Sequence, residues 1–168
     1  IQYNNSINYL YQPSESHQLS FSVDWTHFDG KARCKQPNDY FSSNNILIRS
    51  DLFYSQPDKD IDIYALLADY KYKPNAQNEW LIGAKTSLIK SNNIFLFKKN
   101  GLIDSQRSNR FKYNEDNIET YVQYTLSLNK LELSTGLRME YMYTNNKLHS
   151  YANQLIEENN RKKLNLFP

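Results

Sequence analysis

Hydrophobic and polar residues alternate with a period of two over most of the chain, and the clearest run spans residues 117–143. In its second half one parity is apolar, comprising Leu131, Leu133, Leu137, Met139, Tyr141 and Tyr143. The other parity is polar, comprising Glu132, Ser134, Gly136, Arg138 and Glu140. A period of two gives a strand one apolar face and one wet face. Residues 127–130 are a short polar connection, so the run predicts a hairpin of two long amphipathic strands.

The same alternation predicts further long strands at residues 1–12, 18–28, 61–72 and 80–88, with a shorter one at 46–54. Short polar turns separate some of them, at residues 13–16 and 73–78. We predict long loops at residues 29–45, 91–116 and 144–161, a break at 56–60, and a hairpin turn at Asn100-Gly101. A short helical turn within residues 150–159 is weakly indicated. About six spanning strands result, with short connections at one end and long ones at the other.

The strand length favours a membrane. Soluble strands usually run about 5–6 residues, whereas these alternate for roughly ten, the length that a tilted strand needs to cross a bilayer. The lopsided connections are typical of outer-membrane barrels, although a soluble sandwich can also cluster long loops at one end. The residues expected to face lipid are Leu19, Phe21, Val23, Ile82, Val122, Leu133 and Leu137, with Trp25 at the interface. Leu133→Arg should therefore block membrane assembly far more than Glu132→Arg.

Composition narrows the classes of function. The chain of 168 residues has a net charge of +2, which gives no electrostatic case for nucleic acid. No apolar run is long enough for a membrane helix. Aromatics are abundant, with 14 Tyr and 8 Phe, and they favour strands and membrane interfaces. The sequence starts without Met and stops within an apolar run, so we expect a piece of a longer chain.

No catalytic, cofactor-binding or metal site is predicted. Phosphate loops, serine elbows and zinc-helix motifs are missing, and Cys34 is alone. The histidines lack ligand spacing, and the carboxylates of Asp51, Asp60 and Asp62 do not fit a calcium loop. The basic cluster Lys31, Arg33 and Lys35 suits a solvated loop. The aromatic residues Tyr40, Phe41, Phe95 and Phe97 could stack on a ligand or pack on one another.

Six charged residues on the polar parities are expected to face the lumen of a barrel: Asp24, Asp69, Lys85, Glu132, Arg138 and Glu140. They could line a substrate path with mixed charge. The interpretation that we favour is that they pair across strands and keep the interior hydrated.

Four segments in order resemble the TonB-dependent receptor barrels, in particular their outer-membrane β-barrel branch. Tyr121-Val122-Gln123-Tyr124, followed after a turn by Gly136-Leu137-Arg138-Met139-Glu140, is similar to a hairpin of that family. Similar matches are found for residues 68–70 with 80–85, for 111–115 and for 160–168.

The resemblance implies the middle to late part of a large barrel whose plug domain lies outside this sequence. Implied partners are outer-membrane lipid, the remainder of the barrel, the plug, the TonB complex and a surface lipoprotein. The ligand stays open.

We therefore predict an all-β fold, an antiparallel up-and-down meander over residues 1–168 that forms part of a transmembrane β-barrel in the cell outer membrane. Its role would be ligand binding and uptake, without catalysis. Two alternatives are a soluble all-β glycan-binding sandwich and a small eight-stranded outer-membrane barrel complete in itself.

Overall fold

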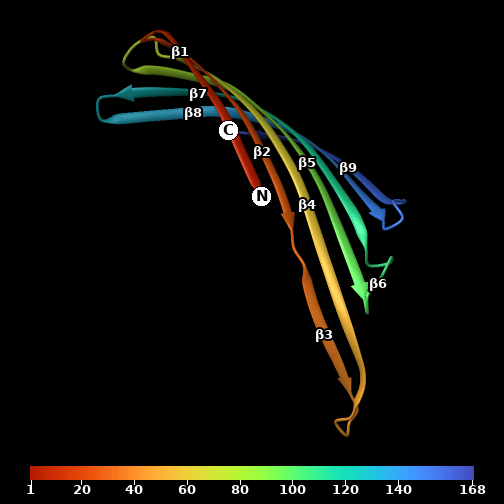
Figure 1. Cartoon of the computed structure of the whole chain (residues 1–168). Coiled ribbons are helices and arrows are strands. Elements are labelled where there is room, and N and C mark those ends of the chain that lie inside the picture. Colours follow the sequence, from red (N-terminus) through yellow and green to blue (C-terminus); the bar gives the residue numbers. More distant parts are fainter.

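The computed structural model describes all residues, 1–168, as one antiparallel sheet without helices (Figure 1). The strands are β1 (Gln2–Ser14), β2 (His17–Lys31), β3 (Cys34–Phe41), β4 (Leu47–Tyr72), β5 (Asn78–Lys99), β6 (Leu102–Ile103), β7 (Asn109–Leu128), β8 (Leu131–Ser150) and β9 (Leu155–Phe167). The chain contains no helix of the length and apolarity that a membrane span requires.

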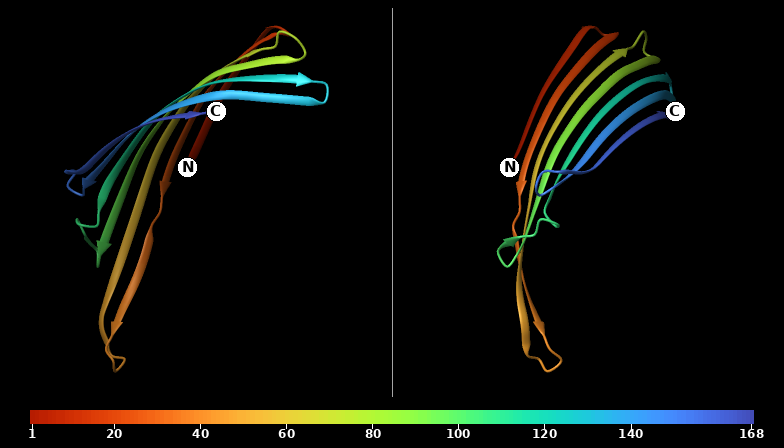
Figure 2. Two further views of the ribbon diagram at one scale, coloured as in Figure 1. Left: turned by 180° about the vertical axis from the view of Figure 1, so that it is seen from behind. Right: turned by 90° about the vertical axis from the view of Figure 1, so that its right-hand side faces the viewer.

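Seven strands form the path of the sheet, in the order β1-β2-β4-β5-β7-β8-β9, while β3 and β6 extend it beside β4 and β5. Each strand on the path pairs with its predecessor, which confirms the up-and-down meander and gives one strand more than expected. The sheet is curved (Figure 2). It is also open, because its two outer strands, β1 and β9, do not pair with each other. No hydrophobic side chain is buried, so the two-sheet sandwich is wrong. An unclosed path of seven strands also excludes the self-contained eight-stranded barrel.

The register of the strands sorts the residues into the predicted faces. Phe21, Ala68, Ala84, Thr120 and Met139 are successive cross-strand partners, so they share one face. Most positions of this apolar face are exposed, although Leu19, Ala68 and Val122 are half-buried, whereas most of the opposite, polar face is half-buried. Side chains converge on the concave side of a curved sheet and diverge on the convex side. The polar face is therefore the concave one, as the wall of a barrel with a wet interior requires.

Aromatic rings mark both ends of the apolar face. Tyr72, Trp80 and Tyr124 are cross-strand partners near the short turns, and the Trp80 and Tyr124 ring centroids lie 4.6 Å apart. Trp25 and Tyr64 are partners near the other end. About eight residues separate the two rows along β4, which at about 3.4 Å per residue and a strand tilt of about 40° gives a height of about 21 Å, close to the roughly 25 Å apolar band of an outer-membrane barrel.

The three predicted long loops are mostly strand. Residues 29–45 contain the end of β2 and all of β3, residues 91–116 contain the end of β5, β6 and the start of β7, and residues 144–161 contain the end of β8 and the start of β9. No helical turn occurs in 150–159. These segments were misread because their side chains no longer alternate between apolar and polar, although their backbones remain in the hydrogen-bonded ladder.

The predicted break at residues 56–60 is also wrong, since β4 continues through Pro57. The Pro57 carbonyl accepts a hydrogen bond from the Ala32 amide, so the proline's N side faces the gap between β2 and β3. Proline lacks an N–H and is tolerated where the ladder needs no donor. The interruption of the neighbouring strand at Ala32 and Arg33 is such a place.

The predicted hairpin turn at Asn100-Gly101 is confirmed. It joins β5 to β6 with two residues, and both have positive φ, 51° at Asn100 and 84° at Gly101. Two left-handed residues define the type I′ turn that fits the twist of a hairpin, and Asn-Gly is its preferred sequence.

We expect a charged substitution on the apolar face to destabilise the fold most near the middle of the membrane. Leu137 lies near the middle of the apolar run of β8, and Leu133 lies closer to its turn end. Leu137→Arg should cost about 2–4 kcal/mol of folding free energy, and Leu133→Arg less, because the penalty falls towards the interface. Glu132→Arg, on the polar face, is the control. The folded fraction of the full-length protein in outer-membrane extracts measures all three, and equal tolerance of the three would remove the assignment of faces.

Candidate functional site

All six residues predicted to face the lumen lie on the polar face of the sheet. Two of them, Arg138 and Glu140, belong to one ion cluster, in which the Arg138 guanidinium lies 2.9 Å from the Glu119 carboxylate and 3.8 Å from that of Glu140. Asn117 donates to both carboxylates. The remaining four are spread over the face: Asp24, Asp69, Lys85 and Glu132. Within the apolar band, the polar face therefore carries one ion cluster, around Arg138, among charged side chains without an ion-pair partner.

Asp69 has a partner that sequence spacing does not reveal. The Tyr121 hydroxyl donates to Asp69 from two strands away, across Gly83 on β5. A Cβ placed on Gly83 would collide with both the tyrosine ring and the carboxylate. Glycine at this position thus lets the ring lie flat against the sheet. The signal in the sequence is a glycine on the polar parity of a strand, but only the register identifies the ring that covers it.

Beyond the row of Trp25 and Tyr64, β4 and β5 change character on both faces. Their concave face gains apolar and aromatic side chains among polar ones, namely Phe53, Ile61, Ile63, Ile89, Phe95 and Phe97. Their convex face gains charged side chains beside Ile94 and Leu96, namely Asp58, Asp60, Asp62, Lys90 and Lys98. The concave side of these two strands is thus polar inside the band and richer in apolar rings above it. Above the bilayer the outer face of the sheet is in water and does not need apolar side chains. Apolar side chains exposed on the inner face at that height indicate a binding surface.

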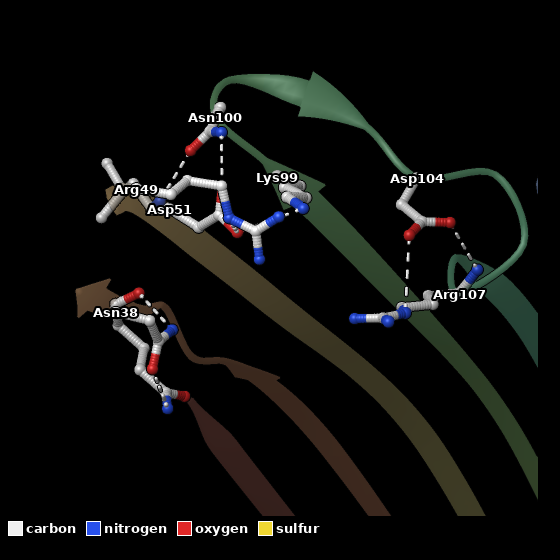
Figure 3. A network of polar contacts seen from close by, with 9 residues as sticks. Asn38, Arg49, Asp51, Lys99, Asn100, Asp104 and Arg107 are labelled. Carbon is white, nitrogen blue, oxygen red and sulfur yellow. Dashed lines mark hydrogen bonds and ion pairs between the residues drawn. The ribbon is translucent and has the colours of Figure 1, made fainter. Parts of the chain in front are cut away.

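Cations lie over several of these concave aromatic rings. The Arg49 guanidinium is 4.3 Å from the Tyr40 centroid, and that of Arg107 is 5.1 Å from the Phe97 centroid. We call Tyr40, Arg49, Phe53, Phe97, Lys99 and Arg107 the arm cluster, since it lies where the hairpin of β3 and β4 meets the end of β5. This hairpin projects past the others in Figure 1, and Figure 3 labels Arg49, Lys99 and Arg107 of the cluster. Cations over ring faces are attracted by the ring quadrupole and are held in place without being neutralised.

A buried carboxylate ties the arm cluster together. Asp51 is 2% exposed, and its carboxylate lies 3.1 Å from Arg49 Nε and 3.2 Å from Lys99 Nζ. The Asn100 side chain donates to Asp51 and accepts from the Leu52 amide, which joins the β5–β6 turn to β4 (Figure 3). Desolvation by burial raises the pKa of the Asp51 carboxyl, but the hydrogen bonds from Asn100 and Lys99 and the nearby positive charges outweigh it. The pKa therefore lies below its ordinary value of 3.8.

The accessible charge of the arm cluster is positive. The side chains of Arg49, Lys99 and Arg107 are 56%, 45% and 60% exposed, whereas Asp51, the counter-ion shared by Arg49 and Lys99, is buried. Asp104 pairs with Arg107 at 3.5 Å. A surface of rings and exposed cations can hold a flat or anionic ligand by stacking and by charge-assisted hydrogen bonds. Of the loop aromatics named from the sequence, Tyr40 and Phe97 lie in this cluster, and Phe95 stacks on Phe97.

The structure also brings together a cross-strand group that sequence spacing concealed. Potential ligand atoms of His27, Asp60 and Asp62 lie within 4.8 Å of one another on the convex face. The His27 and Trp25 side chains both hydrogen-bond to Asp62 Oδ1, His27 at 3.0 Å and Trp25 at 3.4 Å. These bonds hold His27 and Trp25 against Asp62, just above the apolar band.

Comparison with known proteins agrees with this geometry. The family described as the outer membrane protein beta-barrel family matches residues 13–168. No curated protein matches the sequence. Among solved structures, the unliganded ferric citrate transporter FecA superposes with a TM-score of 0.65 at 9% identity, covering 98% of this chain and 23% of FecA. The ferric yersiniabactin uptake receptor FyuA from Yersinia pestis gives 0.67 at 8% identity, covering 98% and 24%. The chain thus spans about a quarter of either protein, and the likeness shows the fold.

The contact across Gly83 gives a stability prediction. Tyr121→Phe removes a hydrogen bond to a carboxylate and should cost about 1–3 kcal/mol. Gly83→Ala should cost at least as much, because the new methyl displaces both ring and carboxylate. Denaturant unfolding of the full-length protein in detergent measures both. Tyr9→Phe is the matched control, because the Tyr9 side chain is exposed on β1, and a Tyr121→Phe loss no larger than the Tyr9→Phe loss would contradict the prediction.

The Asp51 carboxylate gives a pH prediction. Its pKa is lower in the folded arm than in the unfolded chain, so its stabilisation is present above the unfolded value and is lost as pH falls through the folded value. Protection factors of the amides across β3 and the start of β4, which are exchange rates corrected for the intrinsic pH dependence of amide exchange, should therefore fall on acidification below about pH 4. Asp51→Asn should show low protection factors already at neutral pH. Protection factors in the wild-type arm that do not change with acid would contradict this role.

Proposed function

Because the chain belongs to the outer membrane protein beta-barrel family, we propose that it forms one wall of a receptor barrel that binds a ligand outside the cell and passes it inward. In the outer membrane a closed sheet satisfies every backbone group in lipid. Seven strands cannot enclose a lumen wide enough for transport, so further strands complete the barrel. The six charged residues of the polar face, from Asp24 to Glu140, would then line that lumen.

The observation that carries this proposal is the change of character of β4 and β5 above the apolar band. A barrel that only sealed or anchored the membrane would need no apolar, cation-rimmed interior above the bilayer. The concave surface around Phe53 and Phe97 offers rings, and Arg49, Lys99 and Arg107 offer charge. We propose that this surface is the part of the outer vestibule on which a ligand first binds.

The partners follow from the proposed role. A plug domain would occupy the lumen against the polar face, the TonB complex would supply energy, and a surface lipoprotein could cover the vestibule. FecA is a ferric citrate transporter and FyuA takes up ferric yersiniabactin, so iron chelates are the first ligands to test. We expect binding and uptake without a catalytic step.

Depletion of a growth medium tests the proposal with a mixture of candidate ligands. Cells with and without the full-length protein are compared for loss of individual compounds from a medium that includes ferric citrate and ferric yersiniabactin. At least one compound should disappear only when the protein is present and the membrane is energised. The proposal fails if depletion is the same in both strains, or if it continues after the proton gradient is dissipated.

Arg107→Glu addresses the vestibule surface itself. Arg107 pairs only with Asp104 and lies outside the Asp51 network, so the arm should stay folded. Reversing its charge should slow uptake of the depleted compound about tenfold at low concentration, a change equivalent to about 1.4 kcal/mol. Lys130→Glu, in the turn at the other end of the sheet, is the control. Equal uptake by both variants would remove the arm cluster from the ligand path.

A further inference from the structure

One imidazole and three carboxylates occupy four adjacent positions on the convex face of β2 and β4, just above the upper aromatic row. Register makes His27 the direct partner of Asp62, and Asp29 the direct partner of Asp60. All four share the parity of Trp25, so their side chains leave the same face of the sheet. Local spacing gives no sign of this group, because His27 and Asp62 are 35 positions apart in the sequence.

The distances within the group match those between ligands of one metal ion. His27 Nδ1 lies 3.0 Å from Asp62 Oδ1, and a carboxylate oxygen of Asp60 lies within 4.8 Å of both. Two ligands that each lie about 2.0–2.1 Å from one ion, at tetrahedral or octahedral angles, are about 3.0–3.4 Å apart. The exposed Asp60 side chain makes no hydrogen bond or ion pair, so a change of rotamer is enough to bring its carboxylate to the same distance.

The charge around the group favours a cation. Asp29 and Asp60 are directly opposed like charges, an arrangement that destabilises a sheet. The nearest ammonium groups on this face are those of Lys31, 3.6 Å from Asp29, and of Lys90, the direct partner of Asp62. Since Asp58 is on the same face as well, the carboxylates outnumber the ammonium groups.

Two buried oxygen atoms next to Asp60 point independently to a missing cation. Asp58 Oδ1 and Asn92 Oδ1 are both shielded from solvent and have no hydrogen-bond partner. Asp58 precedes Asp60 by two residues on β4, and Asn92 is the direct partner of Asp60 on β5. Buried polar atoms in proteins nearly always have a partner, and a cation can interact with oxygen atoms that lack a donor.

Neighbouring aromatic side chains hold two members of the group in position. The Trp25 indole N–H donates to Asp62 Oδ1 at 3.4 Å. The Tyr3 ring stacks on the His27 imidazole, with the ring centroids 6.3 Å apart. Metal ligands are commonly oriented by such surrounding contacts.

We propose that His27, Asp60 and Asp62 bind a divalent transition-metal ion of the zinc class on the outside of the wall. An imidazole nitrogen among the ligands favours Zn²⁺ and similar ions over Mg²⁺ and Ca²⁺. Three protein ligands leave one position of a tetrahedral ion to water. The ion links β2 to β4 just below the place where β2 ends, and so fastens the base of the β3–β4 hairpin. The site lies on the opposite face from the lumen, so the inference holds whichever ligand passes through the barrel.

The test is calorimetric titration of Zn²⁺ into the full-length protein in a non-ionic detergent. The protein carries no histidine tag and is first treated with a chelator. Asp60→Asn and His27→Gln should each weaken binding at this site by about tenfold or more relative to wild type. The matched control is Asp116→Asn, which removes the same charge from the same face of β7, in the row of Tyr64. This variant should bind Zn²⁺ as wild type does.

Three results would overturn the proposal. One is an equal Zn²⁺ affinity in Asp60→Asn and wild type. Another is an equal loss of affinity in Asp60→Asn and Asp116→Asn, which would mean that Zn²⁺ is attracted only by the negative charge of the face. The third is an affinity for Mg²⁺ as high as that for Zn²⁺, which would exclude the imidazole as a ligand.

Melting temperatures with and without metal separate binding from a structural role. Added Zn²⁺ should raise the melting temperature of wild type, because an ion that binds only the folded state stabilises it, and should not raise that of Asp60→Asn. In the metal-free protein Asp60→Asn should leave the melting temperature unchanged or raise it, since Asp60 is opposed by Asp29. A fall would show that Asp60 supports the fold without a metal ion and would contradict the proposal.

Discussion

Backbone pairing between neighbouring strands is the interaction on which this structure depends. The chain has 118 hydrogen bonds between backbone groups, of which 107 lie within the strand ladder, and it buries no hydrophobic side chain. A soluble protein without an apolar core would not fold. In lipid the balance of folding free energy is different, because each unpaired backbone amide or carbonyl costs several kcal/mol. Apolar side chains are satisfied there by facing the acyl chains. Backbone hydrogen bonding in the sheet therefore stabilises this fold in place of a packed apolar core.

Once the ladder is fixed, side-chain chemistry decides what each surface does at each height. Within the band, the convex face contacts acyl chains and the concave face holds paired charges such as Arg138 with Glu119. Above the band the ladder continues without interruption, but the environment on both sides is aqueous. The same two parities are then free to carry different surfaces, an aromatic and cationic one inside and a charged one outside. One continuous secondary structure thus supports a membrane wall, a vestibule and a charged outer surface.

The sequence was informative where lipid imposes alternation, and uninformative beyond it. The faces of Phe21, Leu66, Ile82 and Leu137 follow from parity alone, and Asn100-Gly101 follows from turn chemistry. Residues 29–45 and 144–161 were misread as loops because strands in water need no alternation. The contacts of Tyr121 with Asp69 and of Asp51 with Lys99 join residues 52 and 48 positions apart. No local pattern encodes such pairs, since they depend on how two or three strands align.

The end of β5 beside β4 has a consequence for how such proteins diversify. Up to Pro57 β4 pairs with β2 and β5, and beyond it β4 pairs with β3 and, as far as Phe53, still with β5. Adding or deleting paired residues in the β3–β4 hairpin beyond Phe53 changes the reach of the hairpin but leaves the pairing of β4 with β5 unchanged. A lineage can therefore lengthen or shorten the tip of this arm while inheriting the same wall.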